Sequence, residues 1–339
     1  MPRPRSASVT LLKAKLLARL RDGFHRPGQP FFSARAMTER FGVSYQTAHR
    51  LLAELEREGW VERRASAGTF VAGRREIWKG VDLWFANRAR RKDSFGERLL
   101  LVLRNALQRQ GIQHRVRWGG ETKHAADLAA DWYPVFWELP TLATGLATER
   151  RYVLMLEDRL GHGLAASYAD SVSVDDYSGG VAAGEWLAAQ LPGTRCAVLA
   201  GPDGDARNRL RVAGFKAVHP RAPVVKAGSW FYDEAVRAVP DVLGFAGVFC
   251  ANDRLASAVV ETVAGRGIPG PLVVGFDDAP VSERLDFTTI AIPWEDVAAA
   301  ACDVARRRMA GDVRTAAALT FAPRPIIRSA ATGLTDTNS

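Results

Sequence analysis

The amino-acid sequence predicts an α/β protein with a small, basic N-terminal module and a larger domain built on parallel sheets. Its 339 residues are too many for one ordinary core, which favours one small and one large domain. The net charge of +9 falls within residues 1–75, which hold 15 basic and 6 acidic side chains, whereas residues 76–339 hold 31 of each. From Ile77 onward, apolar runs of strand length alternate with helical stretches, as in a parallel sheet covered on both faces.

The charge asymmetry predicts that the N-terminal module binds a polyanion, with a solvated basic surface as the alternative. Lys13 and Lys15 interrupt the leucines after the basic start, so we expect no signal peptide and no transmembrane helix. The three cysteines have no metal-ligand spacing, and Cys196 and Cys250 fall in apolar runs. We therefore expect free, buried thiols in a cytoplasmic protein without metal or cofactor.

Residues 8–72 carry the pattern of three helices and a hairpin. A first helix over 8–21 has one apolar face: Val9, Leu12, Leu16 and Leu20. Ser33 caps a short second helix with apolar Ala34, Met37 and Phe41. Gly42 ends that helix, and Ser44 caps a third that runs to Gly59, with a core face of Ala48, Leu51, Leu52 and Leu55.

The opposite face of the third helix predicts a DNA-reading surface. Its first turns carry side chains that can form hydrogen bonds: Tyr45, Gln46, Thr47, His49 and Arg50. The start of a recognition helix is where side chains meet base edges and phosphates in the major groove. WVERR and TFVA around a glycine-bearing turn predict a β-hairpin, so we expect a winged helix-turn-helix (α+β). A generic three-helix bundle, the alternative, needs neither a hairpin nor a basic excess.

Residues 31–72 resemble the DNA-binding domain of the GntR family, through the stretch FFSARAMTERFGVSYQTAHRLLAELEREGWVERRASAGTFVA. The resemblance implies a phosphate contact by Arg35 and further DNA contacts by the recognition helix and the wing tip: Ser44, Tyr45, Gln46, Thr47, His49 and Gly68. Tyr45 and His49 stand where the family usually has arginine, and Ser66 replaces a usual glycine. The resemblance therefore implies DNA binding without implying the family's usual operator sequence.

The remainder alternates strands and helices. We expect strands in WKGVDLWFA, IQHRVRW, YPVFWEL, RYVLMLED, RCAVLAG, 246–250 and PLVVGFD, and helices over 94–110, 179–190, 207–218 and 255–266. Parallel sheets bind ligands at the carboxyl ends of their strands. Four polar residues fall at such ends: Asn252, Asp253, Asp277 and Asp278. Helix caps and turn formers are the alternative, which we favour for Asp253.

Residues 172–330 resemble the effector-binding domain of the LacI/GalR family, itself similar to periplasmic sugar-binding proteins. The matching stretches are SVSVDDYSGGVAAGEWL, AVLAGPDGDARNRLRVAGF, GVFCANDRLA, VVGFDDAP, FTTIAIPWEDVAAAACDVARRRMAG and PRPIIRSA. Residues 77–170 match less well, and 118–132 look shortened. The two resemblances imply a winged helix-turn-helix over 1–75, a type 1 periplasmic-binding-protein-like domain over 76–332 and a polar tail over 333–339. The lobes of the larger domain are expected over roughly 76–173 plus 293–319 and 174–292 plus 320–332.

This second resemblance also implies effector contacts by Arg209, Trp230, Asn252, Asp277 and Trp294, to which we add Phe85, Asn87 and Arg90 just after the first strand. The chemistry suits a polyol, because arginine donates, asparagine both donates and accepts, and aspartate accepts two hydroxyls. A tryptophan ring can stack on the apolar face of a sugar. Core packing is the alternative for each tryptophan.

Together the resemblances imply a homodimeric repressor that binds a two-fold symmetric double-stranded DNA operator under the control of a sugar in the cleft between the lobes. A DNA-binding protein with a vestigial sensor is one alternative. An enzyme on a DNA-binding head is another, although the sequence has no nucleophile elbow, HExxH, P-loop or dinucleotide glycine fingerprint.

Overall fold

The computed structural model of the chain describes residues 7–21, 25, 28–65, 67–72, 78–122, 124–129, 131–161, 163–312 and 314–328. Ser66, Ile77 and the expected polar tail over 333–339 lie outside the described residues. The chain divides into two compact units. Unit 1 comprises Met1–Asn87, Leu107–Ser171 and Ala301–Ala317, and unit 2 comprises Arg88–Ala106, Val172–Ala300 and Ala318–Ser339.

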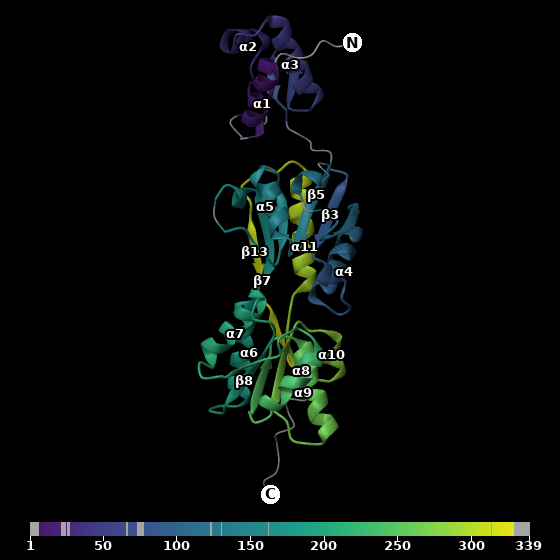
Figure 1. Cartoon of the computed structure of the whole chain (residues 1–339), viewed down its shortest axis with the longest axis vertical. Helices are drawn as coiled ribbons and strands as arrows, with labels where there is room; N and C mark the ends of the chain where they lie inside the picture. The colour runs from purple at the N-terminus through teal and green to yellow at the C-terminus, as the bar shows by residue number, and fades with distance from the viewer. Residues whose placement is uncertain are drawn as a thin grey trace. The chain divides into compact units, whose positions relative to one another are not determined.

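The N-terminal module has the predicted helices and hairpin: α1 (Ala7–Arg21), α2 (Ala34–Phe41), α3 (Tyr45–Arg57), β1 (Val61–Arg64) and β2 (Gly68–Val71) (Figure 1). Ser33 and Ser44 cap α2 and α3, where their side chains accept hydrogen bonds from backbone N–H groups. Gly42 ends α2 at a φ of 64°, a left-handed conformation that suits glycine. The apolar faces of the three helices meet in one core, which includes Leu16, Met37, Leu51, Leu55 and Trp60.

The wing is the β1–β2 hairpin together with the segment that precedes α2. β1 and β2 pair antiparallel, with Val61 opposite Val71. Pro30 forms a β-bridge with Phe70, and the N–H of Phe31 donates to the carbonyl of Thr69 at 2.7 Å. A two-stranded hairpin alone is marginally stable, so this third segment helps to hold the wing in place.

The first large sheet has the strand order β13-β7-β6-β5-β3-β4. Its strands are β3 (Gly80–Phe85), β4 (His114–Trp118), β5 (Trp132–Trp137), β6 (Val153–Leu156), β7 (Ala169–Val174) and β13 (Ala318–Phe321). β3 pairs in parallel with β4 and β5, and β5 pairs in parallel with β6. Helix α5 (Pro140–Thr148) packs on one face, where Leu142 and Leu146 share a core with Trp84 and Phe136.

The connection from β4 to β5 contains little regular secondary structure. Parallel strands are usually joined by a crossover that contains an α-helix. In the described residues between Trp118 and Trp132, the crossover forms only the 3₁₀ turn η2 (Ala125–Asp127). This is the segment that the sequence marks as shortened, and its brevity leaves the sheet beside β4 thinly covered.

The second large sheet has the order β14-β12-β11-β10-β8-β9. Its strands are β8 (Cys196–Ala200), β9 (Val224–Lys226), β10 (Gly247–Cys250), β11 (Leu272–Phe276), β12 (Thr288–Ala291) and β14 (Arg324–Ile326). Neighbouring strands are parallel except β14, which runs antiparallel to β12. Helix α6 (Asp176–Gln190) precedes β8, and the helices that follow along the chain are α7 (Ala206–Val218), α8 (Tyr232–Ala238), α9 (Asp253–Arg266), α10 (Pro280–Arg284) and α11 (Trp294–Met309). Helix α4 (Phe95–Arg109) follows β3 earlier in the chain.

Helices α6 and α7 approach closely because glycines lie at their contact. A Cβ on Gly180 would collide with the carbonyl oxygen of Arg211, and one on Gly214 would collide with that of Tyr177. Neither collision involves a flexible side-chain end, so only glycine fits. The contact fixes α7 against the first turns of α6 and thereby positions the buried arginine of α7 described below.

The three cysteines are free and buried, as predicted for Cys196 and Cys250. None of the helices that the structure describes is long and apolar enough to cross a membrane. Among the same residues, no three histidine, cysteine, aspartate or glutamate side chains gather as a metal site requires.

Candidate functional site

The first turns of α3 expose a polar surface. Tyr45 is 62% exposed, and Gln46, His49 and Arg50 are exposed as well. The Ser44 hydroxyl instead accepts from the N–H of Thr47 at 3.2 Å and lies 2.9 Å from the Thr47 hydroxyl. Ser44 and Thr47 therefore fix the start of the helix, and the four exposed side chains extend outward from it.

Arg63, a wing residue that the sequence analysis did not identify, contacts His49. Arg63 Nη1 lies 3.3 Å from His49 Nε2, and Arg63 Nε donates to Glu56 Oε2 at 2.7 Å. The hydrogen bonds from Arg63 lower the pKa of Glu56, which keeps the carboxylate charged. Arg63 lies on the same face of β1 as the buried Val61, and this alternation was the available signal.

Arg35 and Gly68 are accessible at two other places on the module. The Arg35 side chain is 86% exposed, and its Nε lies 3.2 Å from Glu39 Oε1 one turn along α2. An exposed ion pair of this kind contributes little to stability, so Arg35 can exchange Glu39 for a phosphate at small cost. Gly68 opens β2 at a φ of 109°, with open space where a Cβ would lie.

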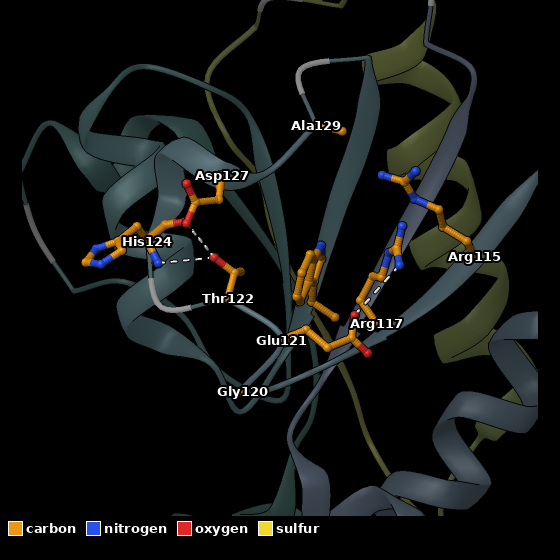
Figure 2. A pocket seen from close by; sticks show the side chains of 9 residues that line it. Arg115, Arg117, Gly120, Glu121, Thr122, His124, Asp127 and Ala129 are labelled. Atoms are coloured by element: carbon orange, nitrogen blue, oxygen red, sulfur yellow. Dashed lines mark hydrogen bonds and ion pairs between the residues drawn. The ribbon is translucent and has the colours of Figure 1, made fainter.

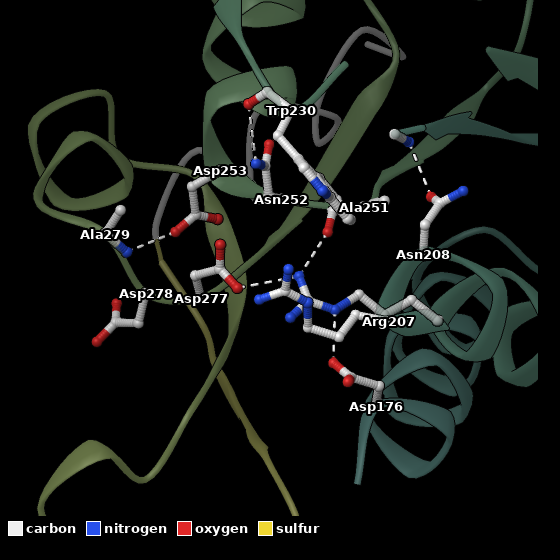
Figure 3. Close-up of polar contacts among 12 residues, drawn as sticks. Asp176, Arg207, Asn208, Trp230, Ala251, Asn252, Asp253, Asp277, Asp278 and Ala279 are labelled. Carbon is white, nitrogen blue, oxygen red and sulfur yellow. Dashed lines mark hydrogen bonds and ion pairs between the residues drawn. The ribbon is translucent and has the colours of Figure 1, made fainter. Parts of the chain in front are cut away.

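In unit 2, charged side chains gather near the carboxyl ends of β8, β10 and β11 (Figure 3). We name the following residues the Asp277 cluster: Arg98, Asp176, Arg211, Asp253 and Asp277. Arg211 links it, because its Nε donates to Asp176 Oδ1 at 2.7 Å and its Nη1 donates to Asp277 Oδ1 at 3.0 Å. The same Nη1 donates to the carbonyl of Ala251 at 2.7 Å. Arg211 is only 2% exposed, so two carboxylates share one buried guanidinium.

Asp277 lies on a strained turn directly after β11. Its φ is 103° and that of Asp278 is 52°, a left-handed region that non-glycine residues rarely adopt. Arg98 Nη1 donates to both carbonyl oxygens, at 3.2 and 2.6 Å, and Trp294 Nε1 donates to that of Asp277 at 3.2 Å. Strain held in place by such contacts is typical of a functional position. Asp277 Oδ2 has no hydrogen-bond partner among the described residues and is left to accept one from a ligand.

Burial and charge act against each other at Asp277. Burial raises the pKa of this carboxyl, whereas Arg211, Arg254 and Arg207 lower it, and the balance lies above the usual value. Trp294 is buried, with its ring 4.9 Å from that of Phe95. The structure therefore gives Trp294 a supporting contact to the backbone of Asp277.

The N-cap of α9 is Asn252, whereas Asp253, for which we favoured a cap or turn role, is buried. Asn252 is the N-cap of α9, where its Oδ1 accepts from the N–H of Leu255 at 2.9 Å and its Nδ2 donates to the carbonyl of Trp230 at 3.1 Å. Asp253, which we favoured as a cap, is instead fully buried and accepts from Thr289 Oγ1 and from the N–H of Ala279, both at 2.6 Å. Burial, with the nearby Asp277 charge, raises the pKa of Asp253 well above its usual value.

Trp230 stands beside a second ionic group. Its Nε1 donates to Asp205 Oδ2 at 3.0 Å, and Arg207 Nη2 donates to the same oxygen at 2.8 Å. Burial alone would raise the pKa of Asp205, but Arg207, Trp230 and Arg88 together hold it well below its usual range. A Cβ on Gly201 would lie 2.7 Å from the Trp230 ring, so glycine there allows the indole to reach Asp205.

Arg209, the arginine that the resemblance selects, is exposed on the outer side of α7. Its Nη1 donates to the carbonyls of Asp203 and Gly204 at 3.4 and 3.2 Å. Arg207 and Arg211 lie one turn apart on the inner side, because residues i and i+4 share a helix face whereas i and i+2 do not. The buried Phe215, four residues after Arg211, was the signal that could have identified the inner arginines.

Phe85 and Asn87 belong to unit 1, whereas Arg90 and the five effector residues that the resemblance implies belong to unit 2. Phe85 has no exposed surface, and its ring stacks on that of Trp137 with the two ring centres 5.6 Å apart. The structure therefore gives Phe85 a core-packing role. The exposed Asn87 donates from Nδ2 to the carbonyl of Gly119 at 2.7 Å. Within unit 2, the structure thus brings together Trp230, Asn252, Asp277 and Trp294 and leaves the exposed Arg209 outside that group.

Unit 1 has a hollow of about 650 Å³ where the short β4–β5 crossover leaves the sheet thinly covered (Figure 2). None of the predicted effector residues lines it. Its walls are Trp84, Arg115, Arg117, Gly120, Glu121, Thr122, His124, Asp127 and Ala129. Arg115 pairs with Asp82 and Arg117 Nη1 lies 3.7 Å from Glu121 Oε2, so both guanidinium groups of the hollow have a carboxylate beside them.

Two sequence profiles match the chain. Residues 10–71 match "Bacterial regulatory proteins, gntR family", and residues 153–311 match "Periplasmic binding protein domain". No match was found among curated proteins. The first profile covers the module that exposes α3, and the second covers most of the second large sheet with its helices.

Solved structures share the fold at low sequence identity. The transcriptional regulator CelR, in complex with cellobiose, is 19% identical with a TM-score of 0.63, over 96% of this chain and 99% of that one. A LacI transcriptional regulator from a Rhodococcus species is 22% identical with a TM-score of 0.60, over 74% and 97%. A periplasmic binding protein/LacI transcriptional regulator from Alkaliphilus metalliredigens QYMF, with D-xylulofuranose, is 16% identical with a TM-score of 0.58, over 73% and 98%. The chain therefore joins a domain that matches the gntR family profile to a domain that matches the periplasmic-binding-protein profile, and it shares the fold of solved LacI-type regulators.

Proposed function

We propose that the protein is a homodimeric transcriptional repressor whose affinity for a two-fold symmetric operator changes when a sugar-like effector binds at the Asp277 cluster. The observation that carries the DNA-binding role is the exposed start of α3, with Tyr45, Gln46 and Arg50 directed outward from a capped helix end in a module of high positive charge. One recognition helix per chain favours two chains on two half-sites about one helical turn apart.

The sensing role is supported by the buried charges in unit 2. A protein would gain more stability from apolar residues than from a buried network such as that of Arg211, Asp176 and Asp277. Ligand binding would explain such a network, because the Asp277 turn is strained and the Oδ2 atom of Asp277 is available to accept from a hydroxyl. Similar folds solved with cellobiose and D-xylulofuranose favour a hydroxylated ligand.

To test the proposal, the full chain is used to select its operator from a pool of random DNA duplexes. The affinity of the chain for that operator is then measured by fluorescence anisotropy, with and without each member of a panel of sugars. We expect a two-fold symmetric consensus and a change in affinity with at least one panel member, because a ligand that favours one conformation must shift DNA binding. Sizing of the complex should give two chains per duplex.

Asp277→Asn separates the two halves of the proposal. It keeps the shape of the side chain and should weaken the effector by about tenfold or more while operator affinity without effector stays unchanged. Tight binding of one chain per duplex would reject the dimer. An operator affinity that no panel member alters would favour the vestigial-sensor alternative, and turnover of a bound compound would favour an enzyme.

A further inference from the structure

Two guanidinium groups near Asp277 carry donors that nothing in the described chain accepts. Arg211 Nη2 is buried and has no hydrogen-bond partner there. Arg254, in the first turn of α9, is partly buried, and its guanidinium forms no hydrogen bond or ion pair with any described residue. Its Cζ lies 5.2 Å from the ring centre of Phe231. Arg211 Nη1 donates to Asp277 Oδ1, and Asp253, the residue before Arg254, accepts from the N–H of Ala279 two residues after Asp277, so both arginines lie near the Asp277 turn.

Four carboxylates of this region form their ion pairs with cations other than Arg254. Asp176 and Asp277 share Arg211. Asp205 pairs with Arg207 and Arg88, and Asp278 pairs with Arg328 at 2.8 Å. Burial raises the pKa of Asp253 and so favours its neutral form.

Positive charge is therefore in excess. Arg98 bonds only to backbone carbonyls in the described structure, and Arg91 stacks on the same Phe231 ring as Arg254. Burial lowers the pKa of Arg254, with Asp277 and Asp93 acting in the opposite direction, which shows that its environment disfavours an uncompensated charge. Guanidinium groups are well suited to carboxylate and phosphate, which they can bind through two parallel hydrogen bonds.

We propose that the effector is an anionic polyol, a sugar acid or a sugar phosphate, and that Arg254 and Arg211 Nη2 bind its anionic group while Asp277 Oδ2 accepts one of its hydroxyls. The inference rests on the proposed function and narrows its ligand. A neutral sugar could accept a hydrogen bond from Arg211 Nη2, but it would leave the guanidinium of Arg254 without an ion-pair partner.

The test compares matched compounds on the full chain by calorimetry: glucose, galactose and mannose, each with its 6-uronate and its 6-phosphate. We expect at least one uronate or phosphate to bind tenfold or more tightly than its own neutral parent and to lose affinity as salt rises. The uronate and phosphate arms distinguish the two sources of the anionic group. Equal affinity of parent and anion within every set, or no binding by any of the nine compounds, would overturn the proposal.

Arg254→Gln tests the assigned residue, with Arg209→Gln as the matched control. Arg254→Gln should weaken the anionic compound by about tenfold or more, whereas Arg209→Gln, on the outer side of α7, should not change it. Arg254→Lys keeps the charge and should recover part of the affinity. An unchanged affinity in Arg254→Gln, with a melting temperature like that of the wild type, would show that the anion binds elsewhere.

The failure of this inference can be told apart from that of the proposed function by measuring operator affinity with the same compounds. A neutral sugar that binds as tightly as its anions and alters operator affinity would reject the anionic effector and keep the sugar-controlled regulator. Compounds that neither bind nor alter operator affinity would count against both.

Discussion

The polar side chains at the start of α3 are exposed and mostly unpaired with one another, whereas those of the Asp277 cluster are buried and paired. Tyr45 and Gln46 extend from one turn of one helix. The cluster combines side chains from α4, α6, α7, α9 and the turn after β11, which lie up to 179 residues apart along the chain. The first surface depends on local helix geometry and the second on the tertiary fold.

This difference predicts how the two regions respond to substitution. A change on the exposed face of α3 should alter DNA binding and leave the free energy of unfolding almost unchanged. A change in the Asp277 cluster should alter stability as well as ligand binding, because each charged group there compensates another. The predictions below test that contrast.

Arg211→Ala should have the largest effect. It leaves Asp176 and Asp277 buried without their shared cation, and breaking a buried pair costs about 3–5 kcal/mol. Arg209→Ala, two residues earlier on the same helix, is the control and should change stability by less than about 0.5 kcal/mol. Denaturant unfolding of both variants measures the difference. Similar losses from the two substitutions would show that the buried network does not stabilise unit 2.

Gly201→Ala should come next. Its Cβ would lie 2.7 Å from the Trp230 ring, and overpacking of this kind costs about 1–3 kcal/mol. Displacing the indole should also weaken its hydrogen bond to Asp205 and change its fluorescence. Gly204→Ala is the matched control, because a Cβ there meets open space. A Gly201→Ala protein with wild-type stability and fluorescence would contradict the close contact.

Gln46→Ala should weaken binding to the selected operator by about 1–2 kcal/mol and leave binding to random DNA nearly unchanged, since glutamine reads base edges. Arg35→Ala should instead weaken both and reduce the slope of log affinity against log salt by about one unit. Anisotropy titrations at several salt concentrations measure both effects. Identical effects of both variants on operator and random DNA would refute the separate roles, and a large loss of stability in either would break the contrast with the Asp277 cluster.

The sequence was sufficient for the N-terminal module because its signals are local. The caps Ser33 and Ser44, the turn at Gly42 and the apolar face that includes Leu51 and Leu55 all act within a few residues. Three strands of the second sheet, β8, β10 and β11, were also predicted as apolar runs. Short elements without strong periodicity, such as α8, α10, β9 and β14, were not, because tertiary contacts rather than sequence pattern determine them.

The candidate effector site was predicted less completely, because a strand end shows where polar groups gather but not which ones point inward. Asp277 was found from its position after VVGF. The choice among Arg207, Arg209 and Arg211 required the orientation of α7, which the close contact at Gly180 and Gly214 sets. Arg98 lies on a helix that the sequence predicts and Arg254 lies just before the predicted start of another, but nothing in either segment indicates its neighbours across the fold.

The smallest expected effect concerns pH and again separates the two regions. The raised pKa of Asp253 means that the folded state keeps a proton that the unfolded chain releases near its ordinary value of 3.8. Stability from this group is therefore fully present at lower pH and declines as pH rises toward the folded pKa. The depressed pKa of Asp205 acts in the opposite sense, and its contribution is lost only as pH falls below that ordinary value. Asp253→Asn stays neutral at every pH and can still accept from the N–H of Ala279.

The free energy of unfolding of unit 2 should therefore fall as pH rises above the ordinary value of 3.8 in the wild type, and it should fall less in Asp253→Asn. Denaturant titrations across this range measure the two slopes, and operator affinity of the same samples should be equal, because Asp253 lies in unit 2 and α3 in unit 1. Parallel slopes would mean that Asp253 is ionised in the folded protein. In that case Arg254 already has a buried counter-ion next to it in sequence, and the excess of positive charge that calls for an anionic effector would disappear.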